Sequence, residues 1–167
     1  MIDQPDDIFI KLLNQHAAIA HKIARGYCTD VDDRSDLFQE MMYQLWRSYP
    51  GFDNRSKFST WMYRVCLNTA LTYKRKSNQY KTETLSVKHN HIAEEASSTM
   101  EENIQFLFDA IATLSAVNKA VILLYLDDLS YEEIASITGL TKSNVSVRLV
   151  RTKKELESIL KHNINPS

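Results

Sequence analysis

The chain has 167 residues, a formal net charge of −1, three glycines, three prolines and two cysteines. So few glycines and prolines, with little strand-like alternation, argue against a β-rich domain and predict an all-α fold. Two cysteines are too few for a disulfide framework, and the near-neutral charge argues against a general polyanion binder. Neither a signal peptide nor a bilayer-spanning apolar run is visible, so we expect a cytoplasmic protein without membrane insertion.

Two amphipathic helices are predicted before the first loop. The first has apolar residues at helical spacing from Ile8 to Tyr27 and is expected to end between about Gly26 and Asp30. The second is expected to start at Ser35 or Asp36, with an inward stripe that includes Leu37.

The outer face of this second helix is unusual for a solvent-exposed surface. Asp36, Gln39, Tyr43 and Trp46 recur at helical spacing there. Because aromatic residues are enriched at protein interfaces, this face favours a protein partner. The alternative is that Trp46 packs on the next helix, and the sequence does not decide between the two.

The stretch 54–82 contains lysines, arginines and aromatic residues but no Asp or Glu. A loop at 48–59 leads into a helix, one face of which carries Trp61, Arg64, Asn68, Thr72 and Arg75. Cations on such a face can bind phosphates, and rings can stack on unpaired bases. The face therefore suits a nucleic-acid strand, although a basic helix face is more often only solvated.

Helical periodicity fails between about Ser77 and Met100, which predicts a linker. His89 and His91 lie in this linker, but no Cys or carboxylate spacing completes a metal site around them. We therefore expect no metal and no cofactor.

The C-terminal part contains helix-turn-helix spacing. Ala135 is followed by Gly139 and then by Val145, and Thr141 can cap the second helix of the motif. The basic residues beyond that cap are Lys142, Arg148, Arg151, Lys153 and Lys154. Ser115 is placed to cap a preceding helix. This combination of spacing and charge predicts DNA binding.

Two blocks of sequence in this order resemble the extracytoplasmic-function sigma factors of bacterial RNA polymerase, members of the sigma-70 family. The block from Asp36 through Trp46 and Phe52 to Arg75 resembles the second conserved region of that family. The block from Leu129 to Leu156 resembles its fourth. This chain has Ser115 and Asp128 where family members often have Pro and Gly, and Asp tolerates a left-handed turn.

The resemblance implies three binding surfaces. Contact with core RNA polymerase is expected at Asp36, Leu37, Gln39, Glu40 and Tyr43. Capture of the single-stranded non-template strand at the minus-ten element is expected at Asn54, Arg55, Lys57, Phe58, Trp61, Arg64, Asn68 and Arg75. Binding of the duplex minus-thirty-five element is expected at Thr141, Lys142, Ser143, Asn144, Val147, Arg148 and Arg151.

The resulting prediction is two small helical domains, 1–77 and 102–163, joined by a flexible linker at 78–101. Such a linker spans up to about 75 Å, enough for two promoter elements roughly 50 Å apart. The predicted function is transcription initiation, with promoter DNA and core polymerase as partners and an anti-sigma factor left open. The alternatives are a stand-alone helix-turn-helix regulator and a helical adaptor protein. An enzyme is least favoured, because no nucleophile–base arrangement or phosphate-binding loop is visible.

Overall fold

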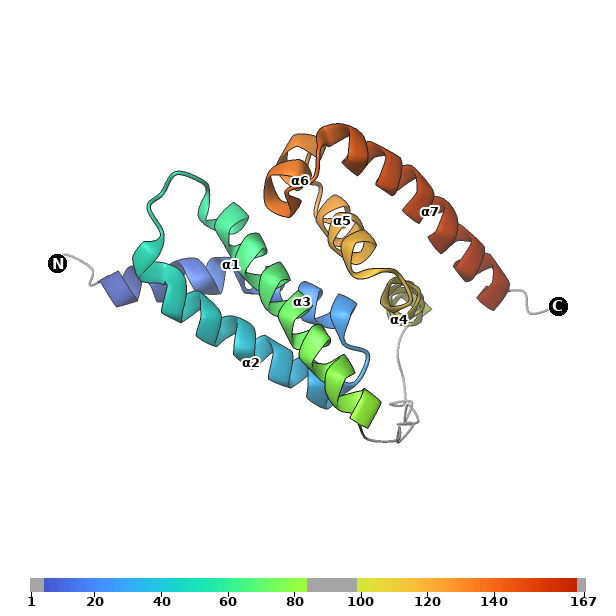
Figure 1. Cartoon of the computed structure of the whole chain (residues 1–167), viewed down its shortest axis with the longest axis horizontal. Helices are drawn as coiled ribbons and strands as arrows, with labels where there is room; N and C mark the ends of the chain where they lie inside the picture. Colours follow the sequence, from blue (N-terminus) through green and yellow to red (C-terminus); the bar gives the residue numbers. More distant parts are fainter. Residues whose placement is uncertain (1–4, 84–98, 165–167) are drawn as a thin grey trace.

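The computed structural model of the chain describes residues 5–83 and 99–164 (Figure 1). These residues form seven α-helices and one short 3-10 helix, without any strand, which confirms the predicted all-α class. In chain order the elements are α1 (Pro5–Tyr27), α2 (Val31–Ser48), η1 (Tyr49–Gly51), α3 (Phe58–Glu83), α4 (Thr99–Ala112), α5 (Ala116–Leu126), α6 (Tyr131–Thr138) and α7 (Lys142–Ile164). No described helix is long and apolar enough to cross a membrane.

Helices α1, α2 and α3 pack on one another and form the N-terminal half of the fold. Their core contains Leu37, Met41 and Leu45 from α2 and Met62 and Cys66 from α3, all fully buried. These residues recur at four-residue steps within each helix, so each helix presents one continuous apolar stripe to its neighbours.

Helix α2 begins at Val31, so the predicted start at Ser35 or Asp36 is wrong. The carboxylate of Asp30 accepts hydrogen bonds from the backbone N–H groups of Asp32 and Asp33, both at 3.0 Å. Asp30 therefore caps the helix and satisfies N–H groups that have no partner within it.

Helices α4 to α7 form the C-terminal half, with α5 at its centre. Helix α5 packs against α1, α6 and α7, and consequently Val121, Ile122, Leu123 and Leu124 are all buried. The hydroxyl of Ser115 accepts a hydrogen bond from the backbone N–H of Asn118 and caps α5 as predicted.

The turns around α6 have the geometry that the sequence indicates. Gly139 ends α6 with φ +76°, in the left-handed region where glycine is unstrained. Asp128 stands before α6 with φ +60°, as expected for an Asp in place of Gly. Thr141 accepts a hydrogen bond from the N–H of Asn144 at 3.1 Å, and Val145 is fully buried. The predicted helix-turn-helix is therefore confirmed as a local structure.

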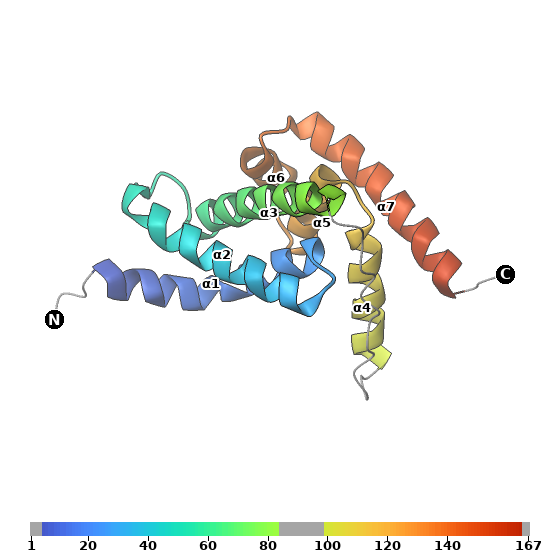
Figure 2. The same cartoon turned by 60° about the horizontal axis from the view of Figure 1, so that its bottom comes forward.

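The two halves contact each other through α1 with α4 and α5, and through α3 with α6 (Figure 1, Figure 2). The hydroxyl of Tyr27 donates a hydrogen bond to the backbone carbonyl of Ala116 at 2.8 Å. A Cβ added to Gly26 would lie 2.7 Å from a Cδ of Leu123, so the absence of a side chain at Gly26 allows this close packing.

Both ends of the predicted linker are helical. Helix α3 continues to Glu83 and α4 begins at Thr99, while 84–98, with His89 and His91, lies outside the described residues. The extra turns of α3 lack an inward apolar stripe, which is why the sequence pattern does not predict them.

Candidate nucleic-acid and polymerase interfaces

The loop before α3 is built on a cluster of aromatic rings. The ring of Trp61 lies 5.1 Å from that of Phe52 and 5.3 Å from that of Phe58, measured between centroids. Tyr49 packs on the same cluster, 6.2 Å from Trp61. Because Phe58 is buried, its role is to fix the loop on the helix, and Trp61 is only partly available to a ligand.

Polar and basic side chains lie in the loop before this cluster and further along α3. Asn54 has φ +59°, and the backbone there turns so that Arg55 pairs with Asp53 at 2.9 Å. Asn68 and Arg75 are exposed along α3. The predicted strand-binding residues thus lie along one loop and one helix face, with Phe58 as the inward exception.

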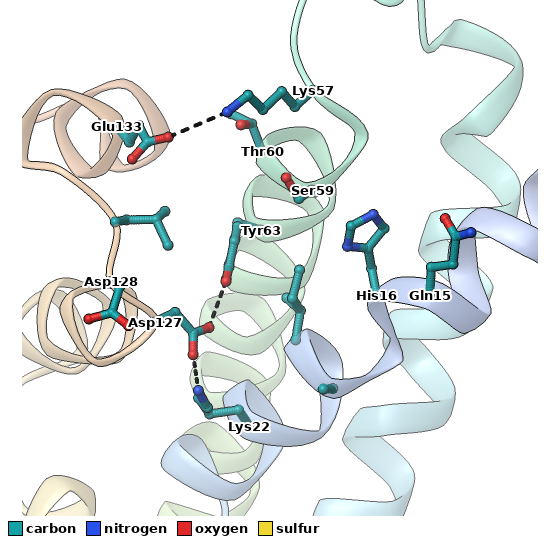
Figure 3. A pocket seen from close by; sticks show the side chains of 13 residues that line it. Gln15, His16, Lys22, Lys57, Ser59, Thr60, Tyr63, Asp127, Asp128 and Glu133 are labelled. Carbon is teal, nitrogen blue, oxygen red and sulfur yellow. Dashed lines mark hydrogen bonds and ion pairs between the residues drawn. The ribbon is translucent and has the colours of Figure 1, made fainter.

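Two of these basic residues contact the C-terminal half. The guanidinium of Arg64 donates hydrogen bonds to the backbone carbonyl and the hydroxyl of Ser136 on α6, at 3.1 and 2.8 Å. The ammonium group of Lys57, whose side chain is 79% exposed, lies 3.9 Å from the carboxylate of Glu133 (Figure 3). The sequence predicts neither contact.

A second polar contact between the halves is centred on Asp127. Its carboxylate accepts a hydrogen bond from the hydroxyl of Tyr63 at 2.6 Å and forms an ion pair with Lys22 (Figure 3). Burial, with a smaller contribution from Glu133, raises the pKa of Tyr63 to about 12, so this hydroxyl keeps its proton at neutral pH. A cavity of about 390 Å³ opens beside the contact, between α1, α3 and the turn before α6.

Helix α7 presents an exposed, mostly polar face at its start. Thr141, Lys142, Ser143, Asn144, Val147 and Arg151 are all exposed there. The ammonium group of Lys142 pairs with Glu132 at 3.0 Å, which positions it beside α6.

Arg148 is the exception on this face, because it is half-buried. Its guanidinium donates a hydrogen bond to the side-chain oxygen of Asn118 on α5 at 3.1 Å. The two residues line a hollow of about 220 Å³ with Asn144, Val147 and Arg151. Sequence reasoning missed Asn118, because only the packing of α5 against α7 brings it to this face.

The outer face of α2 is exposed to solvent. Trp46 is 62% exposed and Tyr43 51% exposed, so Trp46 does not pack on the next helix. Asp36, Gln39 and Glu40 are exposed on the same helix, and Glu40 accepts a hydrogen bond from Gln44.

Leu37 differs from the other polymerase-contact candidates. Its side chain is fully buried in the three-helix core. It can support the outer face of α2 but offers no surface to a partner.

Comparison with known proteins matches each half of the chain to a family model. Residues 12–80 match the family model described as "Sigma-70 region 2", and residues 107–156 match "Sigma-70, region 4". The ECF RNA polymerase sigma-E factor of Escherichia coli K12 is 30% identical over 139 residues, covering 75% of this chain and 73% of the relative. The chain belongs to the ECF sigma factors. Sigma factors direct RNA polymerase to promoters, which is the function of this protein.

Other relatives of this sigma factor agree with that assignment. The RNA polymerase sigma factor SigV of Bacillus subtilis is 27% identical over 150 residues, covering 88% of this chain and 87% of SigV. The sigma factor RpoE from Bartonella quintana, solved in complex with the anti-sigma factor NepR, has the same fold with a TM-score of 0.73. That match covers 92% of this sigma factor and 96% of RpoE at 23% identity.

Proposed function

We propose that this sigma factor uses three separate surfaces during initiation. The outer face of α2 binds core polymerase, the loop and outer face of α3 hold the non-template strand of the minus-ten element, and the start of α7 reads the minus-thirty-five element. The division follows the resemblance of the two sequence blocks to their family regions. We further propose that the chain acts by binding rather than catalysis, and that it works in the cytoplasm.

The observation that carries the proposal is the row of exposed polar groups on α3. Asn68 and Arg75 lie one behind the other beyond Arg64, and acidic residues are absent from 54–82. Duplex binding needs only a helix that fills a groove, whereas an opened strand needs a surface for unpaired bases and phosphates. A helix face with an amide and two guanidinium groups beside a ring cluster provides such a surface.

Asn68→Ala is the sharpest test of strand capture. Asn68 is exposed, so its loss should leave the fold intact, whereas the loss of Trp61 would also disturb the aromatic cluster. We expect polymerase carrying this variant to form the initial complex normally and to open linear promoter DNA less completely. Permanganate footprinting on linear DNA and on a pre-melted bubble measures this. A defect on both templates indicates strand capture, and one on linear DNA alone indicates melting.

Thr72→Ala is the matched control, because Thr72 is exposed on the same face but has no amide or charge. Normal opening by both variants would mean that the α3 face is only solvated and that a duplex-reading regulator fits the chain better.

An anti-sigma partner also belongs to the proposal. RpoE of Bartonella quintana was solved with the anti-sigma factor NepR, and CnrH with the cytosolic domain of CnrY. CnrH has the same fold, with a TM-score of 0.66 over 92% of this chain and 87% of CnrH. We propose that this sigma factor is likewise held by a protein of that class. Co-purification of the tagged chain from its host, with and without polymerase, tests this.

A further inference from the structure

Two exposed valines lie beside each other on α7. Val147 is 48% exposed and Val150 is 52% exposed, and a spacing of three residues makes them neighbours on one side of the helix. Over the described residues 142–163 of this helix, no other large apolar side chain is exposed. A single apolar side chain on a surface is ordinary, whereas these two, the valine pair, form a small apolar patch.

The valine pair points away from the core of the C-terminal half. Val145, Leu149 and Leu156 are buried and mark the inward side of α7. At about 100° per residue, Val147 lies nearly opposite these three, and Val150 lies about 60° from Val147. Helix α7 runs along the outside of the fold (Figure 1, Figure 2). The pair therefore lies on the side of α7 that is free to enter a groove.

Cationic side chains surround the valine pair. The helix contains five basic residues and no acid from Lys142 to Lys154. Arg151 lies one turn beyond Val147, Lys154 lies one turn beyond Val150, and both are exposed. Such a surface attracts the phosphates of a nucleic acid. An apolar patch in its middle gains free energy only if the same nucleic acid brings an apolar group to it.

A hollow beside Val147 has room for such a group. Its volume is about 220 Å³, and of the five described residues that line it only Val147 is apolar. The other lining residues carry amide or guanidinium groups. A methyl group is about as large as a water molecule, whose share of the liquid is about 30 Å³. The hollow therefore admits a methyl group together with the polar edge of a base.

The major groove of DNA offers one apolar group, the C5-methyl of thymine. Guanine, adenine and cytosine present hydrogen-bond donors and acceptors to that groove. A side chain without polar atoms gains from contact with the thymine methyl, but it leaves a donor or acceptor of another base without a partner. Asn144 is exposed one turn before Val147, and its amide suits an adenine in a neighbouring pair.

We infer that the valine pair reads thymine in the minus-thirty-five element by contact with C5-methyl groups. Val147 and Val150 are then specificity-determining residues and not merely parts of a general DNA-binding surface. Val150 is not among the groove-facing residues that the sequence predicts. The inference deepens the proposed function and depends on it, because α7 must lie in the groove for the contact to form.

Deoxyuridine is the probe, because it lacks only the C5-methyl group of thymine. Promoters are first selected from a library randomised in the upstream element, with the full chain and core polymerase. Each thymine of the selected element, on either strand, is then replaced in turn. We expect at least one replacement to weaken promoter binding by wild-type polymerase roughly fourfold, the effect of one buried methyl group. Competition against labelled unmodified promoter measures it.

Val147→Ser with Val150→Ser removes the apolar partner of the methyl group. Both positions are exposed, and Ser and Val have similar helix propensities, so helix content should stay unchanged. The double variant should bind the unmodified promoter more weakly than the wild type, and it should not distinguish thymine from deoxyuridine. The matched control is Ile10→Ser with Val31→Ser, which removes two exposed β-branched side chains from the N-terminal half. The control should retain the fourfold preference for thymine.

A uridine effect that persists in the double variant would overturn the inference, because it would arise from DNA stiffness or from another side chain. A selected element in which no thymine is sensitive to deoxyuridine would also overturn it. In that case a clear upstream preference would leave the proposed function standing and remove only the valine contact. If the selection returned no preferred upstream sequence, the reading of that element by α7 would fail, and the inference would fail with it.

Discussion

The hydrogen bond between Asn118 and Arg148 leads to a test of how the recognition helix reads DNA. An arginine held in one orientation loses less conformational freedom when it binds a guanine or a phosphate than a freely rotating one. One N–H group of Arg148 is bound to Asn118 at 3.1 Å, and a guanidinium has four further N–H groups for DNA. Asn118→Ala should therefore weaken upstream recognition without removing the contact itself.

The expected size follows from the surroundings of the pair. A hydrogen bond to a charged group contributes about 1.5 to 3 kcal/mol when buried. Arg148 is half-buried, so water competes for its N–H groups. We therefore expect Asn118→Ala to weaken DNA binding by about 1 kcal/mol, equivalent to roughly fivefold in affinity. Arg148→Ala should cost more, about 1 to 3 kcal/mol if the side chain reads a base.

A double-mutant cycle distinguishes positioning from an independent contact. Promoters selected from a randomised library by transcription supply the template, and the measurement is transcription against a promoter with a scrambled upstream element. If Asn118 acts through Arg148, the double variant should behave like Arg148→Ala alone. Additive losses would refute this reasoning and would mean that Asn118 binds DNA itself.

Three further outcomes are expected. Gly139→Ala should lower the free energy of unfolding by about 1 to 2 kcal/mol in a denaturant titration, because an alanine at φ +76° is strained while its Cβ meets no neighbour; an unchanged midpoint would contradict the role of that turn. Burial raises the pKa of the Cys66 thiol to about 12, so it should resist alkylation at pH 8 until the chain unfolds, and rapid labelling of the native protein would show otherwise. Asp36→Lys should abolish co-purification with core polymerase at unchanged helix content, whereas Glu155→Lys, an equal reversal in the other half, should not.

The parts of this fold that depend on local patterns were predictable from the sequence. The left-handed turn at Gly139 and the caps at Ser115 and Thr141 each arise from a residue and its immediate neighbours. The start of α2 was not predicted, because Asp30 stands in an acidic run where several residues can cap a helix.

The contacts between the halves could not be predicted, because they join residues far apart in the sequence. In the sequence, Asp127 is only a turn residue, Glu133 completes a capping box and Ser136 is an exposed serine. Their partners Tyr63, Lys57 and Arg64 belong to a loop and helix that the sequence suggests for DNA binding. The sequence therefore gives no reason to expect that they contact the other half. Leu37 shows the opposite error, since a motif position suggested a surface role for a side chain that the core buries completely.

Lys119 links the packing of the two halves to pH. It is only 8% exposed, and burial, with a smaller effect of Lys74, lowers its pKa below 10.5, while Cys28 opposes the shift. Tyr27 faces it from α1 through its ring. At pH values between the pKa of Lys119 in the folded chain and 10.5, the unfolded chain binds more protons than the folded chain. The free energy of unfolding should therefore rise with pH across that window. At pH values below the window, the full cost of a buried ammonium group is present.

Lys119→Met removes that charge and keeps an unbranched apolar side chain in its place. We expect the variant to be more stable than the wild type at pH 7 by about 1 kcal/mol, since an apolar replacement of a buried charge is often stabilising. The difference should shrink as pH rises toward 10.5, because the wild-type lysine loses its proton at lower pH than a lysine in the unfolded chain. Thermal unfolding of both proteins across this range measures it, and titrating groups that do not interact with Lys119 cancel in the comparison. A less stable variant at pH 7 would mean that the contact with the Tyr27 ring outweighs the cost of burial. A difference independent of pH would mean that the charge of Lys119 does not set it.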